Sequence, residues 1–447
     1  MSGKLLPHDA TYESVTSAVT GMTLRRKTHR GWWFGFFLGL MLLNILLISI
    51  GWLFAFGVGV WGINIPVAWG LAIVNFVWWI GIGHAGTLIS AILLLLHQDW
   101  RSSINRFAEA MTLFAVACAG LYPLLHLGRP QLFYYMIPYP ATTGMWPQFR
   151  SPLIWDFFAV GTYATVSLVF WYLGMIPDLA TMRDRCKKRW QARVYGLLAL
   201  GWRNSAVHWM HYKRTYLILA GIATPLVVSV HTTVSWDFAV SIVPGWHSTI
   251  FPPYFVGGAI FCGFAMVLVI AIPLRWYYDL KDLVTEKHLD NMAKIMLASG
   301  LTVSYGYLMD AWAAWYNNEP FDSYIYSNRF DGPYAYCFWA LILCNCLIPQ
   351  ALWFPTIRTH TIALFSIAII VNIGMWLERF IIVSLSLHRD HMPTTWAMYY
   401  PTLWDWLLFA GTFGLFITLM LLFVRWLPSV SMHEMRELVH ASRETAK

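Results

Sequence analysis

The sequence predicts an all-α polytopic membrane protein with about ten transmembrane helices, arranged as two four-helix bundles with one further helix at each end. Of its 447 residues, 58% are hydrophobic and 12% are charged, whereas a soluble domain carries about 25% charged residues. Ten continuous apolar runs are long enough to cross a hydrocarbon core, which takes about 20 helical residues. They lack the alternating pattern of a transmembrane barrel. This composition excludes a water-soluble globule.

The chain divides into a cytoplasmic N-terminal segment (1–31), a membrane domain (32–426) and a cytoplasmic tail (427–447). The first segment is polar and basic, without the pattern of a cleaved signal peptide. Helices are expected because each backbone group must find its hydrogen-bond partner within the span. The expected spans are residues 32–57, 66–97, 105–126, 152–176, 215–236, 251–273, 291–316, 334–352, 360–387 and 402–426.

Local sequence supports several of these elements. The second span contains Gly-Ile-Gly-His84-Ala-Gly, in which small residues allow close helix packing. The aromatic loop 127–151 is expected to pack over a site. The fourth span begins at Ser151-Pro152, a suitable cap followed by a suitable first helical residue. The basic connection 178–214 is expected to lie on the membrane surface.

A faint internal repeat relates the third and seventh spans. A constant shift of 185 aligns Ala108 with Ala293, Met111 with Met296 and Tyr122 with Tyr307. Two related units, about 66–236 and 251–387, would explain these matches. Coincidence explains so few matches equally well, and both interpretations stay open at this point.

Basic residues predict the orientation. Of the 30 Lys and Arg residues, 24 lie in the terminal segments, in loops on the same side as the termini or at the span ends next to them, and 4 lie on the other side. Because Lys and Arg favour cytoplasmic loops, we expect both termini in the cytoplasm and the protein in a bacterial inner membrane. The net charge of +8 is therefore a topology signal, and no nucleic-acid partner is expected.

Ionisable residues within spans are functional candidates because each is costly in hydrocarbon. Their depth along the helices places His126, Asp156 and Asp237 near the outer face. A histidine and two carboxylates in an aromatic pocket suit the removal of two protons from a hydroquinone. The alternative is that these are interfacial residues in contact with headgroup water. The candidates taken from within or next to the spans are His84, Glu109, His126, Asp156, His231, Asp237, Lys294, Asp310, Glu378, Arg379 and Asp405.

The segment His126-Leu-Gly-Arg-Pro, the aromatic loop after it and the Ser-Pro start of the next span resemble the NrfD/PsrC family of polysulfide-reductase-like membrane subunits. The resemblance extends from about residue 32 to 426. Within the family, the ten spans and the combination of His126 with Asp156 and Asp237 are most similar to the ActC subunit of alternative complex III.

The resemblance implies a quinol-oxidising membrane subunit that has no haem or iron–sulfur cluster of its own. His126, Asp156 and Asp237 would bind quinol, either ubiquinol or menaquinol, and accept its protons. The implied partners are an iron–sulfur subunit on the periplasmic side, c-type cytochrome subunits, a second NrfD-like membrane subunit and lipids. The six cysteines form no CxxC pair, which also argues against a cluster within this chain.

Three further residues, His84, Asp310 and Glu378, are candidates for a proton path, with a buried polar network as the alternative. Adjacent Glu378 and Arg379 point about 100° apart on a helix, which predicts separate partners for them. Three other functions stay open: a structural anchor without a working quinol site, a proton-coupled transporter, and a b-type cytochrome. A cytochrome would need paired histidines on facing helices.

Overall fold

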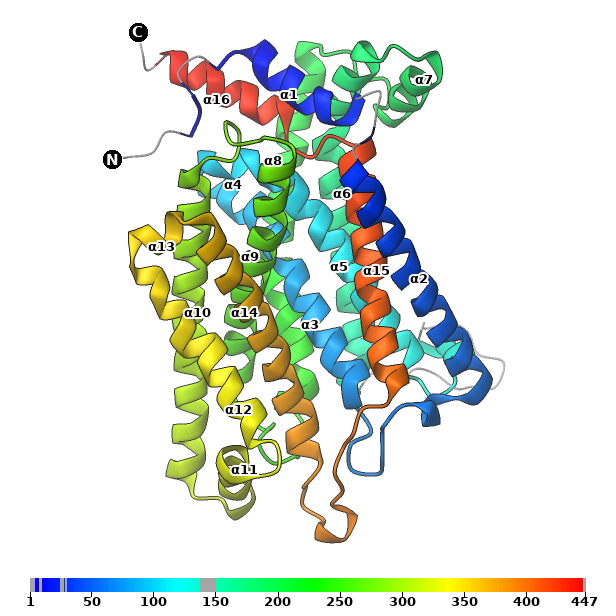
Figure 1. Ribbon diagram of the computed structural model, residues 1–447, viewed down its shortest axis with the longest axis vertical. Coiled ribbons are helices and arrows are strands. Elements are labelled where there is room, and N and C mark those ends of the chain that lie inside the picture. Colours follow the sequence, from blue (N-terminus) through cyan, green and yellow to red (C-terminus); the bar gives the residue numbers. More distant parts are fainter. Residues whose placement is uncertain (1–4, 8–9, 25–27, 29, 137–149, 445–447) are drawn as a thin grey trace.

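The computed structural model describes residues 5–7, 10–24, 28, 30–136 and 150–444. Every regular element in these ranges is helical, as the sequence predicts. The long helices run side by side along the longest axis of the molecule, and short helices lie at both ends (Figure 1). Residues 137–149 of the aromatic loop lie outside the described residues, so the packing of that loop over a site stays a prediction.

Ten helices run most of the length of the molecule. Three of them continue beyond their first α-helical stretch, α3 to Leu95, α12 to Trp353 and α14 to Leu385, each through a π-helical turn. The ten are α2 (Arg30–Phe56), α3 (Gly70–Thr87), α5 (Asn105–Leu125), α6 (Pro152–Arg185), α8 (Ala206–Ala239), α9 (Phe251–Tyr277), α10 (Glu286–Asn317), α12 (Ala335–Ile342), α14 (Thr361–Phe380) and α15 (Leu403–Trp426).

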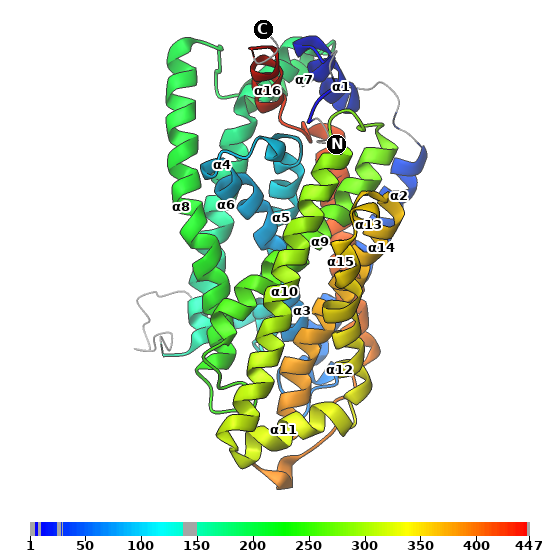
Figure 2. The ribbon, with the colours of Figure 1, turned by 90° about the vertical axis from the view of Figure 1, so that its left-hand side faces the viewer.

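Nine helices in the described part of the chain are long and apolar enough to cross a membrane. They match nine of the ten expected spans. The tenth expected span, 291–316, lies within α10. This helix has 32 residues and would extend about 48 Å, but its first turns carry several charged side chains. Because α10 packs along α9 and returns the chain to the opposite end (Figure 2), we treat it as the tenth span.

The bundle is centred on α3 and α9. In the most apolar 18-residue stretch of each helix, 89% of the residues of α3 and 78% of those of α9 are buried, whereas only 22% are buried in α2 and in α6 at the periphery. Small residues permit the close packing at the centre, as the sequence predicts. A Cβ atom on Gly86 of α3 would lie 2.0 Å from the carbonyl oxygen of Ala108 in α5. The peripheral helices leave most of their surface to lipid.

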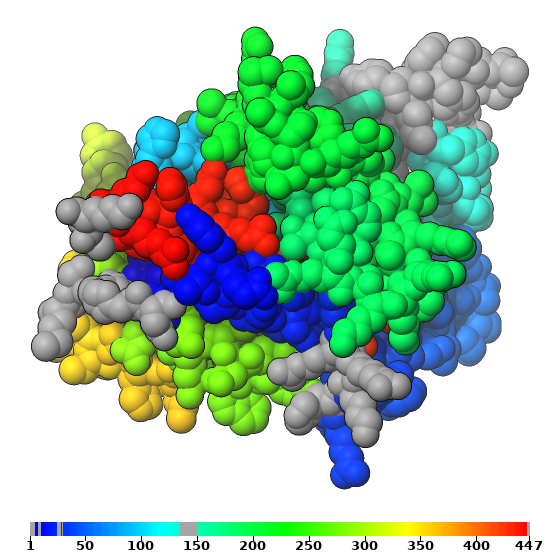
Figure 3. All heavy atoms as spheres, turned by 90° about the horizontal axis from the view of Figure 1, so that it is seen from above, coloured from blue at the N-terminus to red at the C-terminus, as the bar shows by residue number. Residues whose placement is uncertain are grey.

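Both ends of the bundle carry short helices. We call one the terminal end, where α1 (Tyr12–Leu24), α7 (Arg189–Leu198) and α16 (Met432–Glu444) lie, and the other the far end, where α11 (Pro320–Asp331) lies (Figure 1). Seen from the terminal end, α1 and α16 lie side by side (Figure 3). Both termini therefore share one side, as an even number of spans predicts.

Two helices are longer than the sequence predicts. The fourth span was expected at 152–176 and the fifth at 215–236, but α6 continues to Arg185 and α8 begins at Ala206. The apolar run defines the hydrocarbon thickness, whereas a helix continues into the polar interface for as long as its own residues favour it. Ser151 is the N-cap of α6 and Pro152 its first residue, as predicted, although the Ser151 side chain makes no capping hydrogen bond.

The first and last spans form the most extensive pair in the bundle. Instead of flanking the two four-helix units separately, α2 and α15 pack along each other. The indole of Trp32 in α2 donates a hydrogen bond to the Leu421 carbonyl of α15, at 3.0 Å. The division into repeats at about 66–236 and 251–387 stays a prediction.

Candidate functional site

Two carboxyl groups meet at the far end of the bundle. Asp156 lies in the second turn of α6 and Asp237 in the last turn of α8, and these antiparallel helices pack together. The two side chains interact with each other and are 2% and 4% exposed. Apart from this mutual contact, none of their four oxygens has a hydrogen-bond partner among the described residues. The structure thus joins two of the three predicted quinol ligands in one buried site.

His126 lies beside a different part of the far end. It is the C-cap of α5, its ring nitrogen Nε2 lies 3.0 Å from the carbonyl oxygen of Ala68, and its ring stacks at 6.3 Å on Trp61. Because a carbonyl oxygen only accepts, Nε2 carries the proton and the neutral ring offers Nδ1 as a base. No hydrogen bond or ion pair joins His126 to either carboxyl group within the described ranges. The three residues expected to form one site therefore lie as a pair of carboxyl groups and a separate histidine.

Two histidines meet between α3 and α8. The rings of His84 and His231 are 4.5 Å apart, and the His84 ring stacks at 5.2 Å on Tyr163 of α6. His84 Nδ1 donates to the Ile80 carbonyl at 2.6 Å. His84 Nε2 and both His231 nitrogens make no hydrogen bond within 3.5 Å among the described residues, although the ring of His84 also interacts with the backbone of Val227 in α8. The direct ring contact leaves no space for a porphyrin between them.

This histidine pair was not predicted from the sequence, in which His231 stands alone in its span. His84 is 14 residues from the start of α3, and His231 is 8 residues from the end of α8. By residue count alone, the two rings would lie at different levels along their helices. Only the tilt and register of α3 against α8 bring them together, and a single sequence does not reveal these.

The terminal end contains a paired charge network. Arg106 lies 3.1 Å from Glu109 and 3.7 Å from Asp178, and all three are buried. Arg101 and Glu434 of α16 form a further pair at 3.2 Å. These opposite charges satisfy one another, so the network holds α16 on the bundle and is a structural feature.

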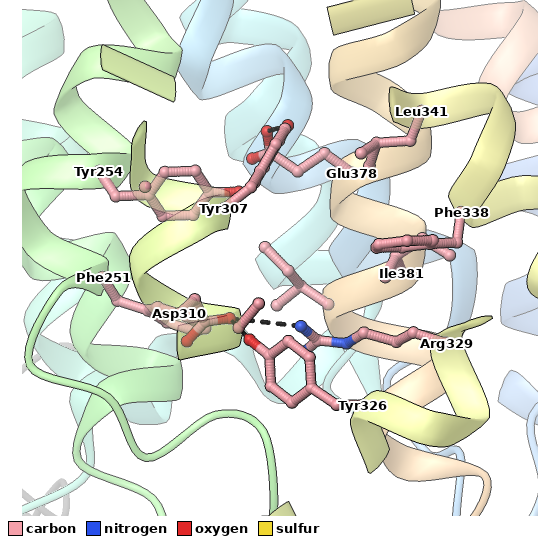
Figure 4. A pocket seen from close by; sticks show the side chains of 13 residues that line it. Phe251, Tyr254, Tyr307, Asp310, Tyr326, Arg329, Phe338, Leu341, Glu378 and Ile381 are labelled. Carbon is pink, nitrogen blue, oxygen red and sulfur yellow. Dashed lines mark hydrogen bonds and ion pairs between the residues drawn. The ribbon is translucent and has the colours of Figure 1, made fainter. Parts of the chain in front are cut away.

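A second polar cluster lies between α10, α11 and α14, around a cavity of about 50 Å³ (Figure 4). Asp310 lies 3.3 Å from Arg329 and accepts a hydrogen bond from Tyr326. Glu378 accepts a hydrogen bond from Tyr307 on the opposite side of the cavity. This volume is enough for one or two water molecules. Two of the three proton-path candidates therefore line one cavity.

The prediction of separate partners for Glu378 and Arg379 was wrong. The two neighbouring side chains form an ion pair with each other. Both are long enough to bend back across the 100° that separates their Cβ directions, and in an apolar bundle the nearest opposite charge compensates best for lost hydration. The second oxygen of Glu378 is the one that binds Tyr307.

The proton-path candidates do not form a continuous cluster. The ring of Phe255 lies 5.8 Å from the ring of His231 on one side and 4.3 Å from the Arg379 guanidinium on the other. An aromatic ring relays no proton, and no hydrogen bond among the described residues joins the histidine pair, which includes His84, to Glu378 or Arg379.

An apolar groove of about 310 Å³ lies between α3, α9, α14 and α15. Its walls include Trp78, Trp376, Trp406 and Phe413, and none of its lining residues is a predicted site residue. The groove suits an aliphatic chain, but its position separates it from the carboxyl pair on α6 and α8.

The family model for the polysulphide reductase NrfD matches residues 59–389, well over half of the chain. The chain belongs to the NrfD family. This family resemblance, inferred from the His126 segment and the number of spans, is confirmed, whereas the ActC assignment within the family stays a prediction. The matched region contains every predicted site residue.

One curated relative is a protein from Halobacterium salinarum that is named as a membrane subunit of dimethyl sulfoxide reductase. It is 28% identical over 250 residues, which cover 54% of this chain and 51% of the relative. The match thus spans about half the length of that relative.

Proposed function

We propose that this chain is the quinol-oxidising membrane subunit of a multi-subunit oxidoreductase, most similar to that of alternative complex III. The observation that carries the proposal is the buried pair of Asp156 and Asp237, which has no cation beside it among the described residues. Two negative charges at such a site would be strongly destabilising. The pair is therefore expected to hold a shared proton and to exchange protons readily, as quinol oxidation requires.

The reaction takes two electrons and two protons from one quinol. Quinol enters from the lipid at the far end, and its hydroxyl protons go to the carboxyl pair and to Nδ1 of His126, the nitrogen that the Ala68 contact leaves as a base. The two electrons pass to an iron–sulfur cluster in a partner subunit on the same side. The product is quinone, and the protons leave to that side.

The proposal includes the expected setting. The protein lies in a bacterial inner membrane with both termini in the cytoplasm, so the far end faces the periplasm and the iron–sulfur subunit. Further partners are c-type cytochrome subunits and a second NrfD-like membrane subunit. Ubiquinol and menaquinol both fit a site built from carboxyl groups and an imidazole.

The test is quinol oxidation by the intact complex with Asp156→Asn. Because the amide cannot accept the proton, activity should fall at least about a hundredfold, the usual contribution of a general base. The matched control is Asp184→Asn at the other end of the same helix, where the carboxylate is exposed and paired with Arg183. This control should keep full activity, and both complexes are first checked for assembly and cofactor content.

Two results would contradict the proposal. Full activity of an assembled Asp156→Asn complex would mean that the carboxyl pair is dispensable and would favour a structural anchor. Uptake of a solute by vesicles that contain this subunit without partners would favour a proton-coupled transporter.

A further inference from the structure

The short helix α7 has an outward apolar stripe although it lies outside the spans. It connects α6 to α8 at the terminal end. Trp190, Val194 and Leu197 follow one another at spacings of four and three, which places them on one face of a helix. They are 51%, 47% and 77% exposed. In water such a stripe would be unfavourable.

The opposite face of α7 holds the helix against the bundle. The Tyr195 side chain is buried, and its hydroxyl donates to the Trp426 carbonyl of α15 at 2.8 Å. The hydroxyl of Tyr172 in α6 donates to the Leu198 carbonyl at 2.7 Å. Two separate spans therefore set the rotation of α7, so its apolar stripe cannot turn inward to be buried.

The stripe is accompanied by uncompensated positive charge. Lys187, Lys188, Arg189 and Arg193 are exposed, and none of them has an ion-pair partner among the described residues. The two arginines just before them are different, because Arg183 lies 2.8 Å from Asp184 and Arg185 lies 2.5 Å from Glu13. Four free cations thus lie within or next to a helix whose outer face is apolar.

We propose that α7 is an amphipathic anchor that binds anionic phospholipids in the leaflet at the terminal end. A helix joined to two spans at their ends lies at the height of the headgroups, where its apolar stripe can enter the acyl region. The four cations then meet lipid phosphates, and each basic residue near an anionic surface adds to the affinity. This site is independent of the proposed quinol chemistry at the far end.

The test is a lipid titration of the purified, delipidated protein in detergent, in which native mass spectrometry counts bound phosphatidylglycerol and phosphatidylcholine. Replacing the four cations should weaken phosphatidylglycerol binding at least about tenfold and leave phosphatidylcholine binding unchanged. The variant combines Lys187→Gln, Lys188→Gln, Arg189→Gln and Arg193→Gln. The control removes the same charge from other positions at the terminal end through Lys213→Gln, Arg214→Gln, Lys281→Gln and Lys287→Gln.

A second variant tests the stripe itself. Trp190→Ser, Val194→Ser and Leu197→Ser change only side chains that are about half or more exposed, so the bundle should still fold. This variant should weaken the binding of both lipids, because it removes the apolar contribution.

Two outcomes would overturn the proposal. One is a charge variant that binds phosphatidylglycerol as tightly as the control variant. The other is protection of Lys187 and Lys188 from amine labelling in the intact complex when phosphatidylcholine is the only lipid, which would assign this face to a protein partner instead.

Discussion

Buried acidic residues are stabilised differently in the two halves of the molecule. Glu378 has an arginine and a tyrosine beside it, whereas Asp156 and Asp237 interact only with each other among the described residues. An unpaired carboxylate in a membrane interior is costly. The first arrangement therefore stabilises the fold, and the second is suited to gaining and losing protons. The two arrangements lead to different predictions.

Removing one member of the Glu378–Arg379 pair should be worse than removing both. Glu378→Gln leaves a buried guanidinium without its counter-charge and should lower the free energy of unfolding by about 3–5 kcal/mol. The double change Glu378→Gln with Arg379→Met removes both charges and should cost much less. Thermal melting of the detergent-solubilised protein measures both effects. Equal melting temperatures for the two variants would show that the ion pair contributes little.

Protonation of His126 should slow quinol oxidation at low pH. Burial lowers the pKa of His126 from its usual 6.5, and the contact with the Ala68 carbonyl opposes this only in part. Nδ1 is therefore free to accept a proton at neutral pH, and kcat/KM should fall only when the pH drops below that lowered pKa and the ring becomes charged.

The corresponding measurement is the pH profile of kcat/KM for the intact complex. His126→Gln should be slow at all pH values and should lose the acid limb. His247→Gln is the matched control, because His247 is also at the far end and also contacts a backbone carbonyl, that of Ser241. A wild-type profile in His126→Gln would exclude this imidazole as the base.

At the scale of the residue, counting how deep each side chain lies along its helix predicted only those contacts that depth alone determines. Asp156 and Asp237 lie near the same ends of two antiparallel helices, so their meeting could be predicted from the apolar runs. The partner of His84 and the Glu378–Arg379 pair could not, because they depend on helix register and on the rotamers of long side chains.

At the scale of the helix, small residues determine how closely α3 and α5 approach. Gly86→Ala would place a methyl group 2.0 Å from the Ala108 carbonyl oxygen. The helices must separate to accept it, and we expect a loss of about 1–3 kcal/mol in the free energy of unfolding. Thermal melting of the purified protein checks this.

Gly51 provides the control for this substitution. It lies within α2, and a Cβ atom there would have nothing within 4 Å. Gly51→Ala should be neutral or stabilise the protein by up to about 1 kcal/mol, because alanine favours a helix more than glycine does. If both variants melted alike, close packing at Gly86 would not matter for stability.

Helix existence was easier to predict than helix ends. Long apolar runs predicted the nine helices of the described residues that are apolar enough to cross a membrane, and α10 as well, because hydrocarbon allows little else. The surface helices α1, α7, α11 and α16 lie in polar segments, where neither length nor apolar content indicates a helix. The ends of α6 and α8 could not be predicted for the same reason.

At the scale of the whole molecule, the proton-path proposal can be tested by stoichiometry. If Asp310 carries additional protons across the membrane, the complex in liposomes should move more than one proton per electron. Asp310→Asn should reduce that ratio to one, which quinol oxidation alone supplies, and leave electron transfer intact. Asp282→Asn, an exposed aspartate in a loop at the terminal end, should change neither quantity.

The outcome also decides the role of the cavity between α10, α11 and α14. A ratio of one in the wild-type complex would mean that the cluster of Asp310, Arg329 and Glu378 serves only to fix the packing of α10, α11 and α14. A ratio that exceeds one and is unaffected by Asp310→Asn would place the route elsewhere in the molecule.

The pairing of α2 with α15 has a consequence for biogenesis. The ribosome delivers α2 to the bilayer first among the spans of this sequence, but the helix that it packs along is delivered last. During all of the intervening translation, the face of α2 that will meet α15 is in contact with lipid. Insertion of α2 and its packing against α15 are therefore separated in time. A nascent chain that ends between residues 386 and 402 contains the first nine expected spans but lacks α15, so the α2–α15 contact cannot form.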